Sequence, residues 1–183
     1  MSSDRSGSLS MFRLLADVKG LAGALKHLEE GVAATIEKRL SELGVFLNEP
    51  AAPAANYIHF VRTGNMLMVS GQICLDGEGK LIAKGQLGGG VSIEDGQKAA
   101  RACAINLLAQ IKVAVGDLDK VVSVVRLGGF VNSVAGYTDG PAVMNGSSDL
   151  MVAAFGDKGR HSRTTVGVAA LPQNAAVEVD GCV

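Results

Sequence analysis

The strongest constraint on the fold is a long helical pattern in the middle of the chain, between Ser92 and Gly116. Ser92 is a favourable N-terminal cap, and the acidic residues Glu94 and Asp95 interact favourably with the helix dipole in the first turn. Apolar residues then recur at helical spacing until Gly116, where we expect the helix to end. A helix of this length buries its apolar face against another layer of structure, which the flanking sequence must supply.

Strand-like runs lie on both sides of this helix. Residues 57–61 and 66–69 are apolar and are joined by Arg62-Thr63-Gly64-Asn65, which predicts a hairpin. After the helix, the pattern predicts a central strand, a second helix beginning near Asn145, and two further strands on either side of Pro172; these elements cover 121–131, 143–155, 164–171 and 176–182. The order β-β-α-β-α-β-β predicts an α+β fold with two helices on one face of a sheet.

The N-terminal part of the chain has a different pattern. Residues 11–28 carry apolar residues at three- and four-residue steps, and Ile36, Leu40 and Leu43 share one face of a shorter helix that Gly44 would cap. We therefore expect a helical extension over 1–50, an extended linker beginning at 51, and a compact domain over 51–183. The extension is interpreted as a packing or oligomer-contact segment, with a targeting segment as the alternative.

Charge and cysteine count argue against several classes of protein. The 17 Lys and Arg against 18 Asp and Glu give a net charge of −1, which predicts neither a nucleic-acid nor a membrane partner. The longest uncharged stretch, 164–177, contains Pro172 and Asn174 and is too short to span a membrane. The 3 Cys and 3 His are scattered, which predicts neither a disulfide framework nor a metal site and is typical of a reducing, cytoplasmic compartment.

The last two strand-like runs carry two ionisable residues. Arg163 and Thr165 alternate with valines in the first run, and Glu178 lies between Val177 and Val179 in the second. We expect the valines to pack under the helices and the opposite face, small apart from Arg163 and Glu178, to form a contact between subunits. The alternative is that both ionisable residues are solvated surface groups.

The expected register of these two runs separates Arg163 from Glu178. A hairpin centred on Gln173 would pair Glu178 with about Val168, five positions from Arg163. That separation is about 16 Å, too far for one small ligand to contact both residues. If the two cooperate, they should meet from different subunits.

Three stretches together resemble the RidA (YjgF) family, also called the endoribonuclease L-PSP or translation-inhibitor family. They are PAANYIHFVRTGNMLMVSGQ from Pro53, SRTTVGVAALP from Ser162 and AVEVDG from Ala176. The resemblance covers about 53–183, and the preceding extension is similar to that of a longer subgroup. It implies a mixed sheet like that of bacterial chorismate mutase, and a homotrimer.

The resemblance also implies a set of site residues. Arg163 corresponds to the arginine that binds a substrate carboxylate, and Glu178 to the glutamate that positions a hydrolytic water. Substrate-binding positions correspond to the family residues of the first hairpin, of the start of the second helix and of the strand after it: Tyr57, Ser70, Gly71, Asn145 and Thr165. Thr165 stands where many members have cysteine, and the stretch after the SGQ sequence lacks the usual proline.

The function that the resemblance implies is hydrolysis of 2-imino or enamine acids to 2-keto acids and ammonia, in clefts between subunits. Arginine binds a carboxylate through two parallel N–H bonds, and a glutamate can accept a proton from the attacking water. An imine is already electrophilic, so no metal or cofactor is expected. One alternative is a trimer that binds a small carboxylate-bearing metabolite without turnover. The endoribonuclease alternative is disfavoured by the lack of a basic stripe and by few aromatic residues.

Overall fold

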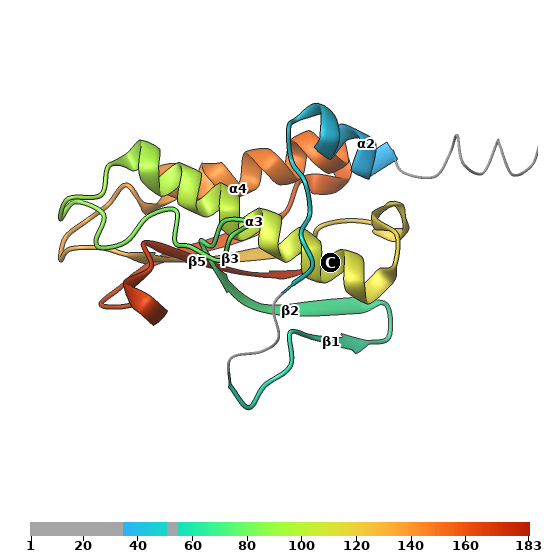
Figure 1. Cartoon of the computed structure of the whole chain (residues 1–183), viewed down its shortest axis with the longest axis horizontal. Coiled ribbons are helices and arrows are strands. Elements are labelled where there is room, and N and C mark those ends of the chain that lie inside the picture. The colour runs from blue at the N-terminus through green and yellow to red at the C-terminus, as the bar shows by residue number, and fades with distance from the viewer. Residues whose placement is uncertain (1–34, 51–54) are drawn as a thin grey trace, which may run out of the picture. The chain divides into compact units, whose positions relative to one another are not determined.

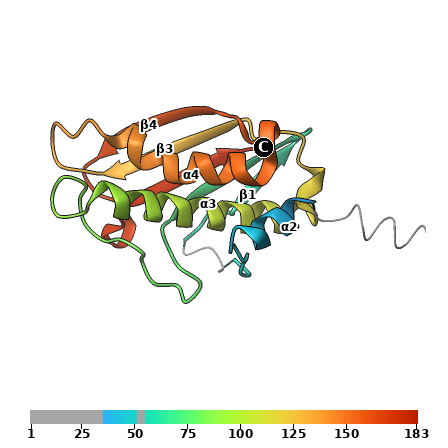
Figure 2. The same cartoon turned by 90° about the horizontal axis from the view of Figure 1, so that it is seen from above.

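The computed structural model describes residues 35–50 and 55–183. Residues 36–183 form one compact unit in which two long helices, α3 and α4, lie side by side on one face of a sheet (Figures 1 and 2). The helices are α2 (Thr35–Glu42), α3 (Ile93–Val115) and α4 (Gly140–Phe155), and the strands are β1 (Phe60–Thr63), β2 (Met66–Ile73), β3 (Arg126–Asn132), β4 (Ser162–Val168) and β5 (Val177–Cys182). The α+β prediction is confirmed. The helix predicted at 11–28 lies outside the described residues.

The strand order in the five-stranded sheet is β1-β2-β5-β3-β4. β3 and β4 are parallel, whereas β1–β2, β2–β5 and β3–β5 are antiparallel, so the sheet is mixed. No helix in the described residues is long and apolar enough to cross a membrane.

Local signals account for the bounds of α3. The Ser92 hydroxyl accepts a hydrogen bond from the Asp95 backbone N–H at 3.1 Å, and Gly116 ends the helix with φ of +80°. α4 crosses α3 closely at Gly146, where a Cβ atom would overlap the backbone carbonyl of Gln97. The buried Ser147 hydroxyl donates to the Ala100 carbonyl at 2.6 Å across the same contact. The two helices therefore form a rigid layer above the sheet.

Several predicted bounds differ from the structure: β1 begins and ends later than predicted, β2 runs on to Ile73, and β4 begins at Ser162 and ends at Val168. Two further differences have a local cause. β3 begins at Arg126 instead of at 121, because a 3₁₀ turn at Leu118–Lys120 comes first and the chain pairs only after it. α4 begins at Gly140, earlier than predicted, with Pro141 in its first turn, a position where proline fits without losing a hydrogen bond.

The predicted hairpin between the last two strands is wrong. β3 lies between β4 and β5 and pairs with both of them, so Glu178 is opposite Phe130 and not opposite Val168. The connection over 169–176 crosses the end of β3 instead of making a tight turn. The buried Asn132 side chain holds this crossing, because its Nδ2 donates to the Ala175 carbonyl and to Asn174 Oδ1, both at 3.1 Å.

The predicted faces of β4 are also reversed. Parallel pairing places Arg163 beside the buried Leu127 and Thr165 beside Gly129, on the side that the helices cover. Val166 faces the opposite, open side of the sheet and is 43% exposed. The prediction assumed that valines mark the buried face, but β4 is an edge strand that the helix layer contacts through polar residues of α4. In β5 the prediction is confirmed: Val177 and Val179 are buried.

Candidate functional site: two groups on opposite faces of the sheet

The predicted site residues fall into two groups, one on each face of the sheet. Arg163, Asn145 and Thr165 lie where β4 meets the first half of α4. Glu178 lies on the open face of β5, with Gly71 beside it on β2. In β4, Arg163 pairs with Leu127 of β3. In β5, on the other side of β3, Glu178 pairs with Phe130, which is three residues after Leu127. At usual strand spacings this is about 14 Å between Cα atoms.

Arg163 is held by three acceptors from α4. One guanidinium nitrogen, Nη1, donates to Asn145 Oδ1 and to Ser148 Oγ, both at 3.0 Å, and Nη2 donates to the Pro141 carbonyl at 3.2 Å. Among the described residues, the Nε–H and the second Nη2–H have no acceptor. These two parallel donors on one edge of the guanidinium match the two oxygens of a carboxylate. The arrangement therefore orients Arg163 and leaves one edge available for an anion.

Ser148 connects Arg163 to His161. The His161 Nδ1 lies 2.6 Å from the Gly159 carbonyl, and its Nε2 lies 3.0 Å from Ser148 Oγ. Because a carbonyl only accepts, Nδ1 carries the proton and Nε2 accepts from the Ser148 hydroxyl. That orientation turns a lone pair of Ser148 toward Arg163. His161 thus positions Ser148, and Ser148 positions the arginine.

Thr165 lies two residues beyond Arg163 on the same face of β4. Its hydroxyl oxygen is buried and has no hydrogen-bond partner among the described residues. A Cβ atom at Gly140 would lie 3.2 Å from the Thr165 methyl group, so the start of α4 comes close to this side chain. A buried hydroxyl without a partner is costly, and the Thr165 hydroxyl is therefore available to a ligand of the Arg163 group.

Glu178 has an unusual electrostatic environment for a carboxyl. Burial raises its pKa above the usual range, and the nearby Asp180 carboxylate raises it further. Asp180 itself is paired with Arg126 at 3.1 Å. A half-buried carboxyl whose pKa is raised accepts a proton more readily than an exposed one, which suits a general base.

Of the predicted residues in and before the first hairpin, Gly71 lies beside Glu178. A Cβ atom at Gly71 would overlap the Glu178 carboxylate, so any other residue there would force that side chain to move. The pairing of β2 with β5 shifts register between Val69 and Gln72, a bulge that spans Gly71. The Ser70 hydroxyl is occupied, because it donates to the Ile58 carbonyl at 2.8 Å.

Comparison with known proteins identifies the family. The profile of the family described as "YjgF/chorismate mutase-like, putative endoribonuclease" matches residues 37–180. The chain belongs to this family. This confirms the family predicted from the sequence.

Three members illustrate the range of similarity within the YjgF/chorismate mutase-like family. Protein TCP17 from Trypanosoma cruzi is 47% identical over 149 residues, which is 81% of this chain and 92% of TCP17. The crystal structure of Atu1372 from Agrobacterium tumefaciens is 45% identical, with a TM-score of 0.77 over 84% of this chain and 95% of that one. RidA from an Antarctic Psychrobacter is 25% identical, with a TM-score of 0.52 over 76% and 96%.

Two residues of the Arg163 group, Ser148 and His161, were not predicted from the sequence. Ser148 follows Asn145 by three positions, one turn of the same helix, and His161 precedes Arg163 by two positions. Both spacings place side chains on one side of their element, so a search for polar residues in phase with Asn145 and Arg163 could have found them.

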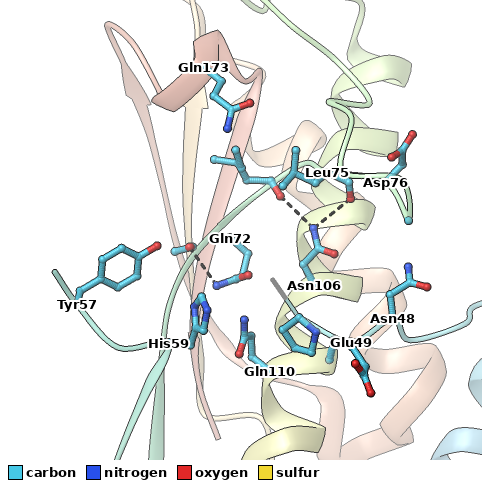
Figure 3. Close-up of a pocket in the computed structure, with 16 residues that line it drawn as sticks. Asn48, Glu49, Tyr57, His59, Gln72, Leu75, Asp76, Asn106, Gln110 and Gln173 are labelled. Atoms are coloured by element: carbon cyan, nitrogen blue, oxygen red, sulfur yellow. Dashed lines mark hydrogen bonds between the residues drawn. The ribbon is translucent and has the colours of Figure 1, made fainter. Parts of the chain in front are cut away.

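Tyr57 and Gly71 also line a cavity of about 420 Å³, whose lining residues are drawn in Figure 3. The cavity reaches neither Arg163 nor Glu178. Within residues 35–50 and 55–183, no group of three or more His, Cys, Asp or Glu side chains could hold a metal ion.

Proposed function

We propose that this chain hydrolyses 2-imino acids to 2-keto acids and ammonia at sites shared between the copies of a homotrimer. The observation that carries the proposal is the Arg163 guanidinium, which α4 holds on one side and which keeps a two-donor edge free among the described residues. Family membership and the similarity to a protein named RidA support it.

Arg163 would bind the substrate carboxylate through its free edge. Two parallel N–H···O bonds fix the orientation of the carboxylate as well as its affinity. The acceptors Asn145 and Ser148 keep the guanidinium in one position, so little ordering is needed when the substrate binds. Thr165 supplies an additional hydroxyl near the same ligand.

Glu178 would act as the base. In the reaction, a water oxygen bonds to the imine carbon while its proton passes to the Glu178 carboxylate. The same proton then passes to the imine nitrogen, which gives a carbinolamine. The carboxylate next takes the hydroxyl proton of the carbinolamine and returns it to the amine nitrogen, so that the C–N bond breaks and ammonia leaves as the C=O bond of the keto acid forms. The raised pKa of Glu178 suits both transfers, since the group must accept a proton and return it.

One copy of the chain cannot bring these two residues to one small substrate, because they lie on opposite faces of its sheet. A second copy can supply the missing residue. The open face supports self-association: Val61, Met68 and Val166 are all exposed on it, and apolar groups of this kind are typical of contact surfaces. The exposed apolar side chains thus support a trimer in place of the face of small residues around Arg163 and Thr165 that the sequence predicted, because α4 covers part of that face.

A coupled assay tests the proposal. An L-amino acid oxidase generates a 2-imino acid in situ, and semicarbazide captures whatever imine has not yet been hydrolysed. We expect the full-length chain to lower the yield of captured imine in proportion to its concentration, and Arg163→Ala to abolish this effect. If the wild-type chain binds the keto acid in calorimetry but never lowers imine capture, the protein is a binding trimer instead of an enzyme.

A further inference from the structure

A second concave site lies beside the first hairpin, apart from Arg163. The cavity of about 420 Å³ is bounded by α3, by β2 and by the segments around 48–50 and 75–79 (Figure 3). Its volume is in the range of small-molecule sites. The polar residues used below are Asn48, Glu49, Gln72, Asp76, Asn106 and Gln110.

Gln110 is the unusual member of this lining. Its side chain is only 2% exposed, although it carries a polar amide on α3. Among the described residues nothing forms a hydrogen bond with that amide, and Figure 3 shows it directed into the cavity between His59 and Glu49. Its nitrogen and oxygen are not among the fully buried side-chain atoms that lack a hydrogen-bond partner, so the small exposed fraction of Gln110 includes its amide. An apolar residue of the same size would fit a purely structural position at least as well. The amide is therefore available to a ligand in the cavity.

Two further amides present their oxygens and not their N–H groups. Asn106 Nδ2 donates to the Ile73 and Leu75 carbonyls, both at 3.1 Å (Figure 3). Gln72 Nε2 donates to the Ser70 carbonyl at 3.0 Å and to the Gly71 carbonyl at 3.1 Å. Since a carbonyl only accepts, the orientation of both amides is determined, and each keeps its oxygen as an acceptor.

The charges in the lining have one sign. Glu49 and Asp76 line the cavity, and neither lysine nor arginine does so among the described residues. Asp76 Oδ1 accepts hydrogen bonds from the backbone N–H groups of Glu78 and Lys80, both at 2.9 Å. The bond from Lys80 in particular holds the pKa of Asp76 below its usual range, so this carboxylate stays ionised at neutral pH. The cavity therefore disfavours carboxylates, in contrast to the Arg163 group.

We propose that this cavity binds a small molecule through a primary ammonium group. An ammonium has three N–H donors, no acceptor and a positive charge. Those properties complement the amide oxygens of Gln72, Asn106 and Gln110 together with the carboxylates of Glu49 and Asp76. Tyr57 and Gly71 line this cavity as well, but the groups that would bind the ammonium include neither Arg163 nor Glu178, so the proposal does not depend on imine hydrolysis.

Calorimetry with two probes of equal chain length tests the chemistry of the site. The full-length chain is titrated with 1,4-diaminobutane and, separately, with succinate in the presence of saturating pyruvate, which occupies the Arg163 group. We expect the diamine to bind and succinate not to bind. Absence of diamine binding at millimolar concentration, or tighter binding of succinate, would overturn the proposal.

Three variants test the location. Gln110→Met removes the amide and keeps the volume, and we expect about 10-fold weaker diamine binding, the usual scale for losing a hydrogen bond to a charged group. Its melting temperature should stay the same or rise, because an amide without a partner is removed from the interior. Glu49→Gln should weaken diamine binding several-fold. Glu49 is an exposed residue, so this substitution does not put folding at risk. Glu94→Gln, the same charge change outside the cavity, is the control and should leave affinity unchanged.

The variants also separate this proposal from the proposed function. Diamine binding that is equal in wild type, Gln110→Met and Glu49→Gln places the diamine elsewhere and contradicts the inference. Imine hydrolysis by Gln110→Met should match the wild-type rate whichever way the diamine result falls. If the chain fails to hydrolyse the imine but binds the diamine as expected, the proposed function is contradicted and the ammonium site is not.

Discussion

Arg163 and Glu178 lie on opposite faces of one sheet, in β4 and β5, with β3 between them. Arg163 turns toward α4, where Asn145 and Ser148 accept its hydrogen bonds, and Glu178 lies beside Gly71 on the open face. A site that needs both residues must therefore be built from two chains.

Mixed oligomers should recover activity that each parent lacks. Arg163→Ala and Glu178→Gln chains are each expected to be inactive in imine hydrolysis. After unfolding and refolding as a 1:1 mixture, about a quarter of the sites should combine an intact Arg163 with an intact Glu178 from a different copy. The measurement is the imine-capture assay on the mixture, with each parent refolded alone as the control. A mixture that stays as inactive as its parents would show that the two residues do not meet between copies.

Arg163→Lys should weaken binding of a 2-keto acid by about 1–3 kcal/mol, because lysine keeps the charge but loses the two parallel donors. Calorimetry with pyruvate measures this change. Arg160→Lys is a matched control, because Arg160 is exposed and, within the described part of the chain, its guanidinium pairs only with Asp157, at 3.3 Å. Equal pyruvate affinity in wild type and Arg163→Lys would mean that this arginine is not the carboxylate-binding group.

Glu178→Gln should lower turnover by about 100-fold or more while changing pyruvate affinity only a few-fold, since a base contributes mainly in the transition state. The base must be ionised, so the wild-type rate should fall as pH falls through the Glu178 pKa. That pKa is raised, first by burial and then by Asp180, so the fall should begin above the ordinary glutamate value of 4.5.

Asp180→Asn provides the control for this pH profile. It removes the neighbouring negative charge, so the pKa of Glu178 should drop and the acid limb of the rate profile should move to lower pH. An acid limb that stays in place in both Glu178→Gln and Asp180→Asn would assign the titration to another group.

Two adjacent serines in α4 should behave differently. Ser148→Ala removes an acceptor of Arg163 and the partner of His161, so we expect KM for the imine to rise several-fold with a smaller change in kcat. Ser147→Ala removes a bond to the Ala100 carbonyl in the helix contact, and should lower the free energy of unfolding by about 1 kcal/mol without changing KM. Steady-state kinetics and chemical denaturation distinguish the two. The reverse result would place Ser148 in the fold and not in the site.

Elements whose signals are local could be predicted from the sequence. Ser92 and Gly116 determine the ends of α3 through a side-chain cap and a positive φ, and both act within a few residues of the chain. The first hairpin was likewise predictable, because Gly64-Asn65 forms its turn between adjacent strands. The candidate site residues were predicted through the family resemblance, because residue types can be matched to a family motif without knowledge of the fold.

Only the tertiary structure decided which strands pair and which face each residue occupies. The pattern at 162–182 is equally compatible with a hairpin and with two strands that flank β3, because alternation describes one strand at a time and carries no information about its neighbour. Because β3 lies between β4 and β5, Arg163 contacts α4 and Glu178 lies on the open face of the sheet. The sequence by itself determined most of the helices and strands and, through the family resemblance, the candidate site residues. The separation of those groups into two half-sites depends on contacts between residues far apart in the chain.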